Sequence, residues 1–144
     1  MKITIKEPAV GAEEEIIILC HNISPELYNA LKTIKARGNF LIANSGNETH
    51  RVNPSDIFYI ESVDNKTFLY CESSVYESKQ KLYELEELAM SDFLRVSKSV
   101  IVNLTKIKAL APALSGRLEA ILQNGERIII SRLYVGNLKE NLGM

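Results

Sequence analysis

The sequence predicts a mostly β protein of the α+β class, and three observations support this prediction. Short runs of β-branched and aromatic residues recur along the chain, separated by turn-forming Asn, Asp, Gly and Pro. Two of these turns, at residues 64–66 and 124–125, are typical of β-hairpins. Three segments carry apolar residues at the spacing of an amphipathic helix. We therefore expect small antiparallel sheets with helices packed against them.

Residues 1–38 predict a short ββα extension. Residues 1–7 and 16–20 are rich in isoleucine, and we expect them to form two paired strands. Ser24 can cap the following helix and Gly38 can end it. Nothing in this extension is typical of a catalytic site, so we expect it to dimerise the protein or to regulate it.

Residues 39–144 predict the main domain. Its expected strands are residues 40–43, 48–52, 57–63, 67–71, 74–77, 93–94, 100–102, 107–110, 117–122 and 126–130. We expect an amphipathic helix at residues 79–90 and a last helix that Ser131 caps and Gly143 ends. The apolar stripe of the first of these helices consists of Leu82, Leu85 and Ala89.

Several classes of protein are excluded by what the sequence lacks. No apolar run approaches the roughly 18 residues of a membrane-spanning helix, and no signal peptide is recognisable, so we expect a soluble, cytoplasmic protein. Cys20 and Cys71 fit no CxxC pattern, and we expect two reduced thiols that pack as small core residues. Because HExxH, P-loop and GxSxG motifs are absent, we expect no enzyme, no metal, no cofactor and no small-molecule substrate.

Charge is distributed unevenly along the chain. Residues 1–92 hold 9 Lys/Arg and 15 Asp/Glu, whereas residues 93–144 hold 8 Lys/Arg and 3 Asp/Glu. The net charge of −1 therefore combines an acidic part with a basic part. A basic segment of this kind indicates an anionic partner such as a nucleic acid, although the acidic part could also dock on it.

The basic part begins with residues 93–104, which hold the densest group of candidate binding side chains. Arg95, Ser97, Lys98 and Ser99 lie between two short apolar runs, so we expect a hydroxyl-rich, cationic turn between buried strands. Such a turn can present donors to a phosphate or to a base edge. The same residues are also typical of an ordinary solvated turn, and the turn alone does not separate these interpretations.

Two more groups of exposed donors are expected on the same scaffold. Asn65, Lys66 and Thr67 lie at the tip of the first hairpin, where we expect them to be exposed. Arg132 occupies the first position of the last helix, beside the end of the second hairpin. These groups and the turn at 97–99 make three clusters that could contact one ligand.

Three motifs occur in a fixed order: F-Y-I-E-S and a tight turn at residues 58–66, F-x-R-x-x-x-S-x-I-V-N at 93–103, and N-G-x-x-I-x-I-S-R at 124–132. Together they resemble the LytTR family of DNA-binding domains over residues from about 40 to 144. The resemblance implies an elongated stack of small antiparallel sheets with an intervening helix and a C-terminal helix. It also implies a transcriptional regulator that reads the major grooves of double-stranded DNA with loops.

The resemblance implies which side chains read the bases. The reading positions fall on Thr67, on Lys98 between its two serines, and on Arg132, and we expect all three to point outward on a common side. The family often has His-Arg or His-Asn where this chain has Ser97-Lys98. Because lysine lacks the planar fork of arginine, the base preference at this turn stays open.

The resemblance also implies partners. Two protomers would bind repeated half-sites, so we expect a homodimer on DNA. Many members carry a receiver domain, for which residues 1–38 are too short, and this chain is similar to the stand-alone branch. In that branch a small membrane protein is implied as a regulator. The alternative function is a protein–protein interaction module without DNA affinity, with the acidic helix at 79–90 and the extension as its surfaces.

Overall fold

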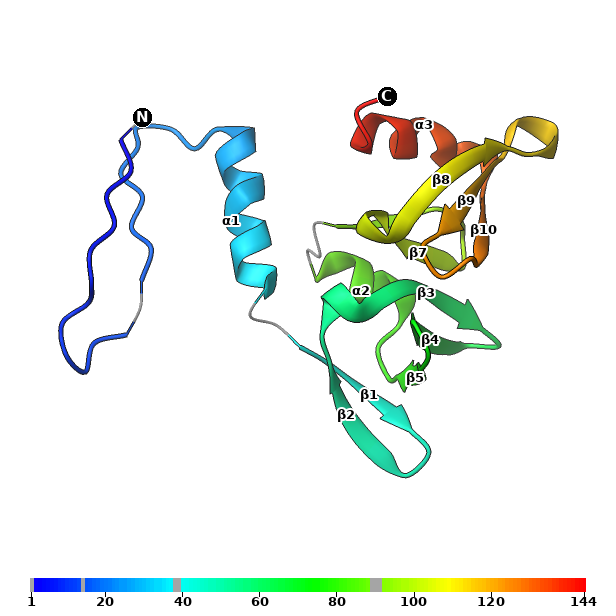
Figure 1. Ribbon diagram of the computed structural model, residues 1–144, viewed down its shortest axis with the longest axis horizontal. Helices are drawn as coiled ribbons and strands as arrows, with labels where there is room; N and C mark the ends of the chain where they lie inside the picture. Colours follow the sequence, from blue (N-terminus) through cyan, green and yellow to red (C-terminus); the bar gives the residue numbers. More distant parts are fainter. Residues whose placement is uncertain (1, 14, 38–39, 89–91) are drawn as a thin grey trace.

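The computed structural model describes residues 2–13, 15–37, 40–88 and 92–144. Figure 1 shows a body of two stacked sheets and, to its left, an N-terminal extension that ends in helix α1 (Pro25–Arg37). The strands are all antiparallel to their neighbours, which confirms the mostly β fold that the sequence predicts. Among the described residues, no helix is long and apolar enough to cross a bilayer.

The larger sheet has seven strands in the order β2-β1-β5-β4-β3-β7-β6. Their bounds are β1 Leu41–Ser45, β2 Glu48–Val52, β3 Ile57–Val63, β4 Lys66–Cys71, β5 Val75–Ser78, β6 Phe93–Arg95 and β7 Val100–Asn103. The smaller sheet has the order β10-β9-β8, with β8 Ile107–Pro112, β9 Leu118–Leu122 and β10 Arg127–Ile130. These bounds lie within one or two residues of the predicted strands, because the turn residues between them are strong signals.

Strand β3 lies between two hydrophobic cores. Ile57 and Ile60 enter a core that helix α2 (Leu82–Glu87) closes, whereas Phe58 and Tyr59 enter a core shared with the smaller sheet and helix α3 (Arg132–Asn141). A register shift between Ile57 and Tyr59 turns neighbouring side chains to these faces. The run of four buried residues at the start of β3 therefore reflects a strand that is covered on both faces.

A pair of stacked tyrosines on the larger sheet lies in the core shared with the smaller sheet. The rings of Tyr59 on β3 and Tyr70 on β4 lie 4.4 Å apart at an angle of 7°. Burial and the hydrogen-bonded carboxylate of Glu126, in the β9–β10 turn, raise the pKa of Tyr59 far above its ordinary value. The phenol therefore stays protonated and can donate to Glu126, which fixes the smaller sheet against the larger one.

Helix α2 is shorter than the sequence predicts, and its predicted start at residue 79 is wrong. Lys81 has an extended backbone (φ −77°, ψ 160°), and the Ser78 hydroxyl accepts the Gln80 N–H at 3.1 Å, so the chain turns before it becomes helical. The predicted end at residue 90 and the apolar role of Ala89 lie outside the described residues. Leu82 and Leu85 are buried as expected.

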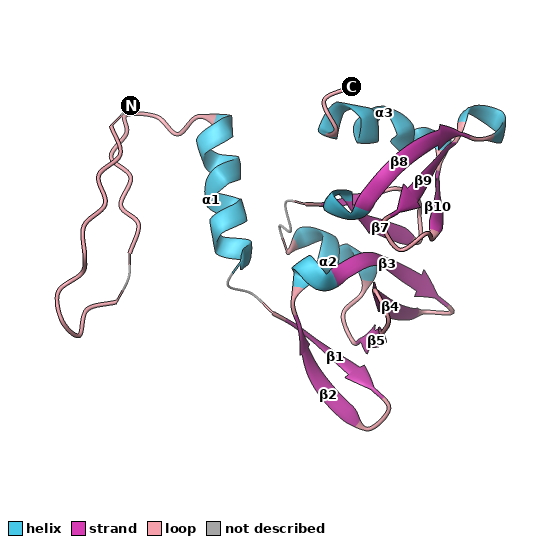
Figure 2. Cartoon of the chain, in the orientation of Figure 1, coloured by secondary structure: helices cyan, strands magenta, loops and turns pink. Residues whose placement is uncertain are grey.

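The extension confirms the predicted helix but not the predicted strands. Helix α1 begins after Ser24, whose hydroxyl accepts the Leu27 N–H at 3.2 Å. Residues 2–7 and 16–20 form no strand, and Figure 2 draws both as loop, so that prediction is wrong. No sheet covers their side chains, and Cys20, expected in a core, is exposed. The predicted helix end at Gly38 and the domain boundary there lie outside the described residues.

Candidate nucleic-acid interface

The β3–β4 turn is a rigid tip that presents Asn65 and Lys66. Asp64 (φ 50°) and Asn65 (φ 63°) both adopt left-handed backbone, as a two-residue hairpin turn with right-handed twist requires. Asp and Asn tolerate this conformation better than other residues with a side chain. The Asn65 carbonyl accepts a hydrogen bond from Lys81 Nζ at 3.1 Å, which holds the tip against the start of α2. Asn65 and Lys66 themselves are exposed.

Thr67 does not lie on this exposed tip, and the prediction that it points outward is wrong. Its residue is only 2% exposed. Thr67 occupies a central strand, opposite Ser62 on β3 and Ser78 on β5. Strand alternation puts it on the face of Leu69, which is the face that α2 covers. The structure thus makes Thr67 a support for the tip, and Lys66 is the side chain that reaches solvent.

The β6–β7 turn is fixed by its own hydrogen bonds. Val96 is fully buried and anchors the turn, and its N–H donates to the Val100 carbonyl at 3.0 Å. The Ser97 hydroxyl accepts the Ser99 N–H at 3.2 Å. Lys98, between the two serines, is exposed and takes part in none of the three ion pairs found in the described part of the chain. The turn therefore presents the Lys98 ammonium from a defined backbone.

Arg95 holds this turn from behind. Its Nε donates to the Ser97 carbonyl at 2.7 Å and its Nη2 donates to the Lys98 carbonyl. Its Nη1 contacts the Glu86 carboxylate on α2 at 2.7 Å, and the side chain is only 20% exposed. These contacts occupy the guanidinium inside the protein, so Arg95 positions Lys98 and is not itself turned toward solvent.

The start of α3 presents Arg132. Ser131 lies at the N-cap position, but its side chain makes no capping hydrogen bond, so the predicted cap is wrong in that detail. The aliphatic stem of Arg132 passes Gly116 in the β8–β9 connection, where a Cβ would lie 3.2 Å from Arg132 Cδ. Gly116 has φ 75° and leaves room for this stem. The sequence carries only a weak signal for this contact, a glycine in a predicted loop.

Two backbone hydrogen bonds bring the three clusters side by side. The Ser62 N–H, near the tip, donates to the Ser99 carbonyl at 2.8 Å. The Ser131 N–H donates to the Val96 carbonyl, also at 2.8 Å. The tip, the turn at 97–99 and the start of α3 therefore follow one another along one edge of the body. In Figure 1, the β3–β4 tip lies at the right, on the side away from the extension.

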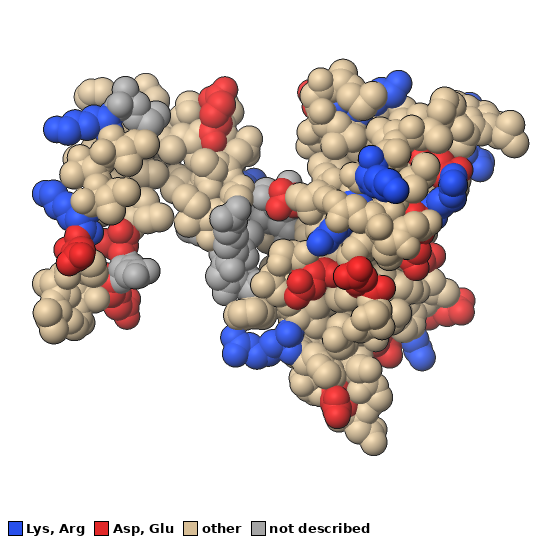
Figure 3. Space-filling model, viewed as in Figure 1, with Lys and Arg blue, Asp and Glu red and all other residues tan. Residues whose placement is uncertain are grey.

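Basic and acidic side chains are also distributed unevenly over the visible face of the molecule. Figure 3 shows lysine and arginine side chains over the upper part of the body, where the smaller sheet lies, and aspartate and glutamate side chains mainly across its middle. The smaller sheet and α3 come from the basic part of the sequence, residues 93–144. Within the described ranges, no group of three His, Cys, Asp or Glu is arranged to hold a metal ion.

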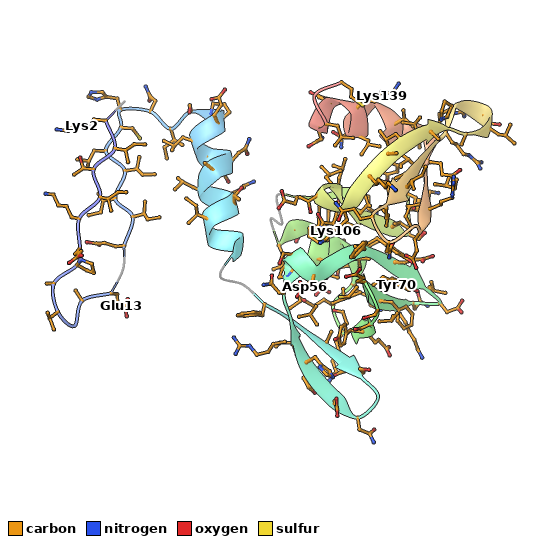
Figure 4. The ribbon with its side chains drawn as sticks, in the orientation of Figure 1. Lys2, Glu13, Asp56, Tyr70, Lys106 and Lys139 are labelled. Carbon is orange, nitrogen blue, oxygen red and sulfur yellow. The ribbon has the colours of Figure 1, made fainter. Side chains whose placement is uncertain are left out.

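A shallow cavity of about 310 Å³ lies at the opposite ends of β3 and β4 from the tip. Asp56, Cys71 and Lys106 line it, and Figure 4 shows Asp56 and Lys106 at this end of the sheet. Lys106 Nζ lies 5.0 Å from the centre of the Phe58 ring. Burial and nearby Asp56 raise the pKa of the Cys71 thiol, and Lys106 lowers it. These charged groups therefore lie at the other end of β3 and β4 from the tip.

These features define a class of protein: a small antiparallel β scaffold that presents cationic turns along one edge. The chain belongs to the LytTr DNA-binding domain family, whose model matches residues 47–143. This match confirms the resemblance that the three sequence motifs indicate. The family is one of DNA-binding domains and not a class of enzymes.

Known relatives agree with this membership. The chain is 32% identical over 94 residues to the sensory transduction protein LytT from Enterococcus faecalis, a match that covers 65% of this chain and 39% of that protein. It is 30% identical over 97 residues to an HTH-type transcriptional regulator from Staphylococcus aureus, covering 67% of this chain and 66% of that protein. The chain thus spans less than two thirds of the length of either relative.

A solved structure shows the same fold. The LytTr DNA-binding domain of a response regulator from Bacillus cereus superposes with a TM-score of 0.70 and 29% identity, covering 74% of this chain and 98% of that one. The name of the Staphylococcus relative mentions a helix-turn-helix, but in the described part of this chain strands separate α1, α2 and α3 from one another. Recognition by a helix pair therefore does not fit this scaffold.

Proposed function

We propose that the protein is a sequence-specific transcriptional regulator that reads the major grooves of double-stranded DNA with loops. One observation carries the proposal: two backbone hydrogen bonds align the tip, the turn at 97–99 and the start of α3 along one edge. Lys66, Lys98 and Arg132 are exposed there. A rigid row of cations suits the regularly spaced phosphates of a duplex.

The exposed side chains have different proposed roles. Arg132 can donate two parallel hydrogen bonds to a guanine, whereas Lys66 and Lys98 act as point charges toward phosphates or a single acceptor. Asn65, Ser97 and Ser99 offer uncharged donors between these cations. Arg95 and Thr67 support the backbone that carries them and make no direct contact with the duplex.

The proposal includes the organisation of the whole protein. The family match lies within residues 47–143, which supports a division into an extension at 1–38 and a DNA-binding domain at 39–144. We propose a homodimer on repeated half-sites, working in the cytoplasm where it meets the chromosome. From the family resemblance alone, we also propose that a small membrane protein restrains the regulator.

Duplexes selected from a random pool, followed by gel-shift titration, test this function. We expect Lys98→Ala and Arg132→Ala each to weaken binding severalfold or more, because each removes a charge from the edge. Lys139→Ala is the matched control, since it removes the same charge from an exposed site near the C-terminal end of α3. Unchanged affinity of both edge variants would contradict the assignment of this edge.

A protein-interaction module without DNA affinity is the competing function. Its proposed surface on α2 is small, because the helix has 6 residues and Glu86 is already paired with Arg95. Retention on heparin at low salt, with elution as salt rises, separates the two functions. A chain of net charge −1 without a DNA-binding edge would pass through such a column.

A further inference from the structure

The N-terminal extension exposes an unusual amount of apolar side chain. The exposed apolar residues before α1 are Ile3, Ile5, Val10, Ile16, Ile17, Ile18, Leu19 and Ile23. Monomeric proteins rarely expose contiguous apolar patches of more than a few hundred Å². A stable protein–protein interface buries roughly 800 Å² on each partner, and a group of eight exposed apolar side chains is the kind of surface that such an interface covers. This part of the surface is therefore suited to a partner.

Within this extension, one segment has the sequence of a strand but does not form one. Residues 16–20 are apolar without interruption, a pattern typical of a strand with a neighbour on each side and cover on both faces. In the structure this segment, the second arm (residues 15–20), forms no strand. Figure 1 shows it running beside the first arm (residues 2–7). The first arm can supply one neighbour, and the other edge of the second arm is open.

We propose that the second arm pairs antiparallel with the second arm of another copy, around a two-fold axis at Ile18. This register places Ile17 opposite Leu19 and Ile16 opposite Cys20, so every central pair is apolar. It also places Glu15 opposite His21, an acid opposite a base. A self-complementary segment of this kind is what a two-fold dimer interface requires.

The first arm is not self-complementary in the same way. The register that brings Ile3 opposite Ile5 also brings Lys2 opposite Lys6, two like charges. Lysines are typical of outer strands, where they prevent further pairing. The arms of two copies thus make a four-stranded sheet with the second arms inside and the first arms outside.

The inference rests on the proposed function in one respect, because it names the interface of the proposed homodimer. Figure 1 places the arms beyond α1, on the side away from the β3–β4 tip. Pairing of the arms therefore leaves the cationic edge of each copy free for a half-site.

Light scattering of the full-length chain without DNA tests the interface. We expect a dimer mass for the natural chain and a monomer mass for Leu19→Glu, which inserts a charge into the central pair. Leu114→Glu is the matched control, because Leu114 is 87% exposed in the body and Leu19 is 93% exposed in the arm. The control should stay dimeric. A monomeric natural chain, or a dimeric Leu19→Glu variant, would overturn the inference.

Disulfide trapping tests the register. In a Cys20→Ser background, Ile18→Cys should form a covalent dimer under mild oxidation, because directly opposed residues of antiparallel strands have Cα atoms about 4.5–5.5 Å apart. Thr4→Cys, in the outer strand, should stay monomeric on a denaturing gel. Trapping at position 4 but not at position 18 would assign the contact to the first arms and reject this register.

Further outcomes distinguish this dimer interface from the proposed function and from insertion into a lipid surface. Leu19→Glu should keep its affinity for a duplex with one half-site and lose the tighter binding to two. If the natural chain is a dimer that binds no duplex, the interface stands and the proposed function fails. If it is a monomer that sediments with anionic phospholipid vesicles, the arms insert into a lipid surface and the inference is wrong.

Discussion

The body and the extension of this protein use similar residues to opposite effect. In β3 of the body, Ile57 and Ile60 are fully buried, whereas in the extension Ile5 is 92% exposed. Both segments have the composition of strands. The difference is the presence of neighbours: β3 pairs with β4 and β7, and the arms pair with no described strand. Residues with high strand propensity therefore form a strand only where a neighbouring strand pairs with them and another layer covers them.

The largest expected effect is a difference in the free energy of unfolding between a leucine variant of the body and a leucine variant of the extension. Leu69→Ala empties a fully buried site on β4 and should lower the free energy of unfolding by about 2–5 kcal/mol. Leu19→Ala changes an exposed side chain and should alter the free energy of unfolding by less than about 0.5 kcal/mol when the chain is dilute. Urea titration of both variants provides the measurement. Equal losses would show that the arm packs against the body in solution.

A repeated motif in the body gives the next largest effect. Asn53 and Asn103 both precede a 3₁₀ turn, and each accepts a hydrogen bond from the backbone N–H two residues later, at 3.1 and 3.0 Å. Asn103 is buried and also donates to the Ile57 carbonyl at 2.8 Å. Asn103→Ala leaves that carbonyl unpaired and should cost about 1–3 kcal/mol, and Asn53→Ala about 1 kcal/mol. Thermal unfolding that ranks them in the reverse order would contradict the burial of Asn103.

Two glycines test whether the cationic edge depends on its support. Gly46 and Gly116 have φ of 59° and 75°, so alanine at either should cost roughly 1 kcal/mol of stability. Only at Gly116 would the new Cβ meet the stem of Arg132, at 3.2 Å. Gly116→Ala should therefore weaken duplex binding severalfold, while Gly46→Ala leaves it unchanged in the same gel-shift titration. Equal duplex affinities of the two variants would indicate that Arg132 does not contribute to DNA binding.

Alkaline pH gives the smallest expected effect, through a buried tyrosine of the body. The pKa of Tyr59 is raised in the folded protein, mainly by burial and then by Glu126. The unfolded chain therefore loses this proton first, so stability is fully present below pH about 10 and falls as the pH rises further. Tyr59→Phe should reduce this fall in urea titrations above pH about 10. The same dependence in both proteins would assign the fall to other groups, such as Tyr70.

Much of the body could be predicted because its signals are local. The Asn124–Gly125 turn and the run at 57–63 specify hairpins through residues that touch one another in sequence. The face of Thr67 could not be predicted, because a shift of one residue after a turn moves a side chain to the opposite face. The roles of Arg95 and Gly116 depend on Glu86 and Arg132, which only the folded chain brings to them.

The three clusters were predictable for a different reason. Lys66, Lys98 and Arg132 each lie beside a strong turn or helix-start signal, and such positions are exposed in most folds. Their alignment along one edge depends on the pairing of β3 with β7 and on the bond between Ser131 and Val96. The arms differ from these clusters, because their sequence signal for strands is strong but they pair with no described strand.

The most direct test of the proposed edge is chemical-shift mapping of the isotope-labelled chain with a selected duplex. We expect the largest changes in amide shifts on residues 64–66, 97–99 and 131–132, with little change in residues 2–7. Salt should reverse these changes, because phosphate contacts are electrostatic. If the largest shift changes fall on α2 or on the cavity near Lys106, and the three clusters do not change, this edge is not the DNA-binding surface.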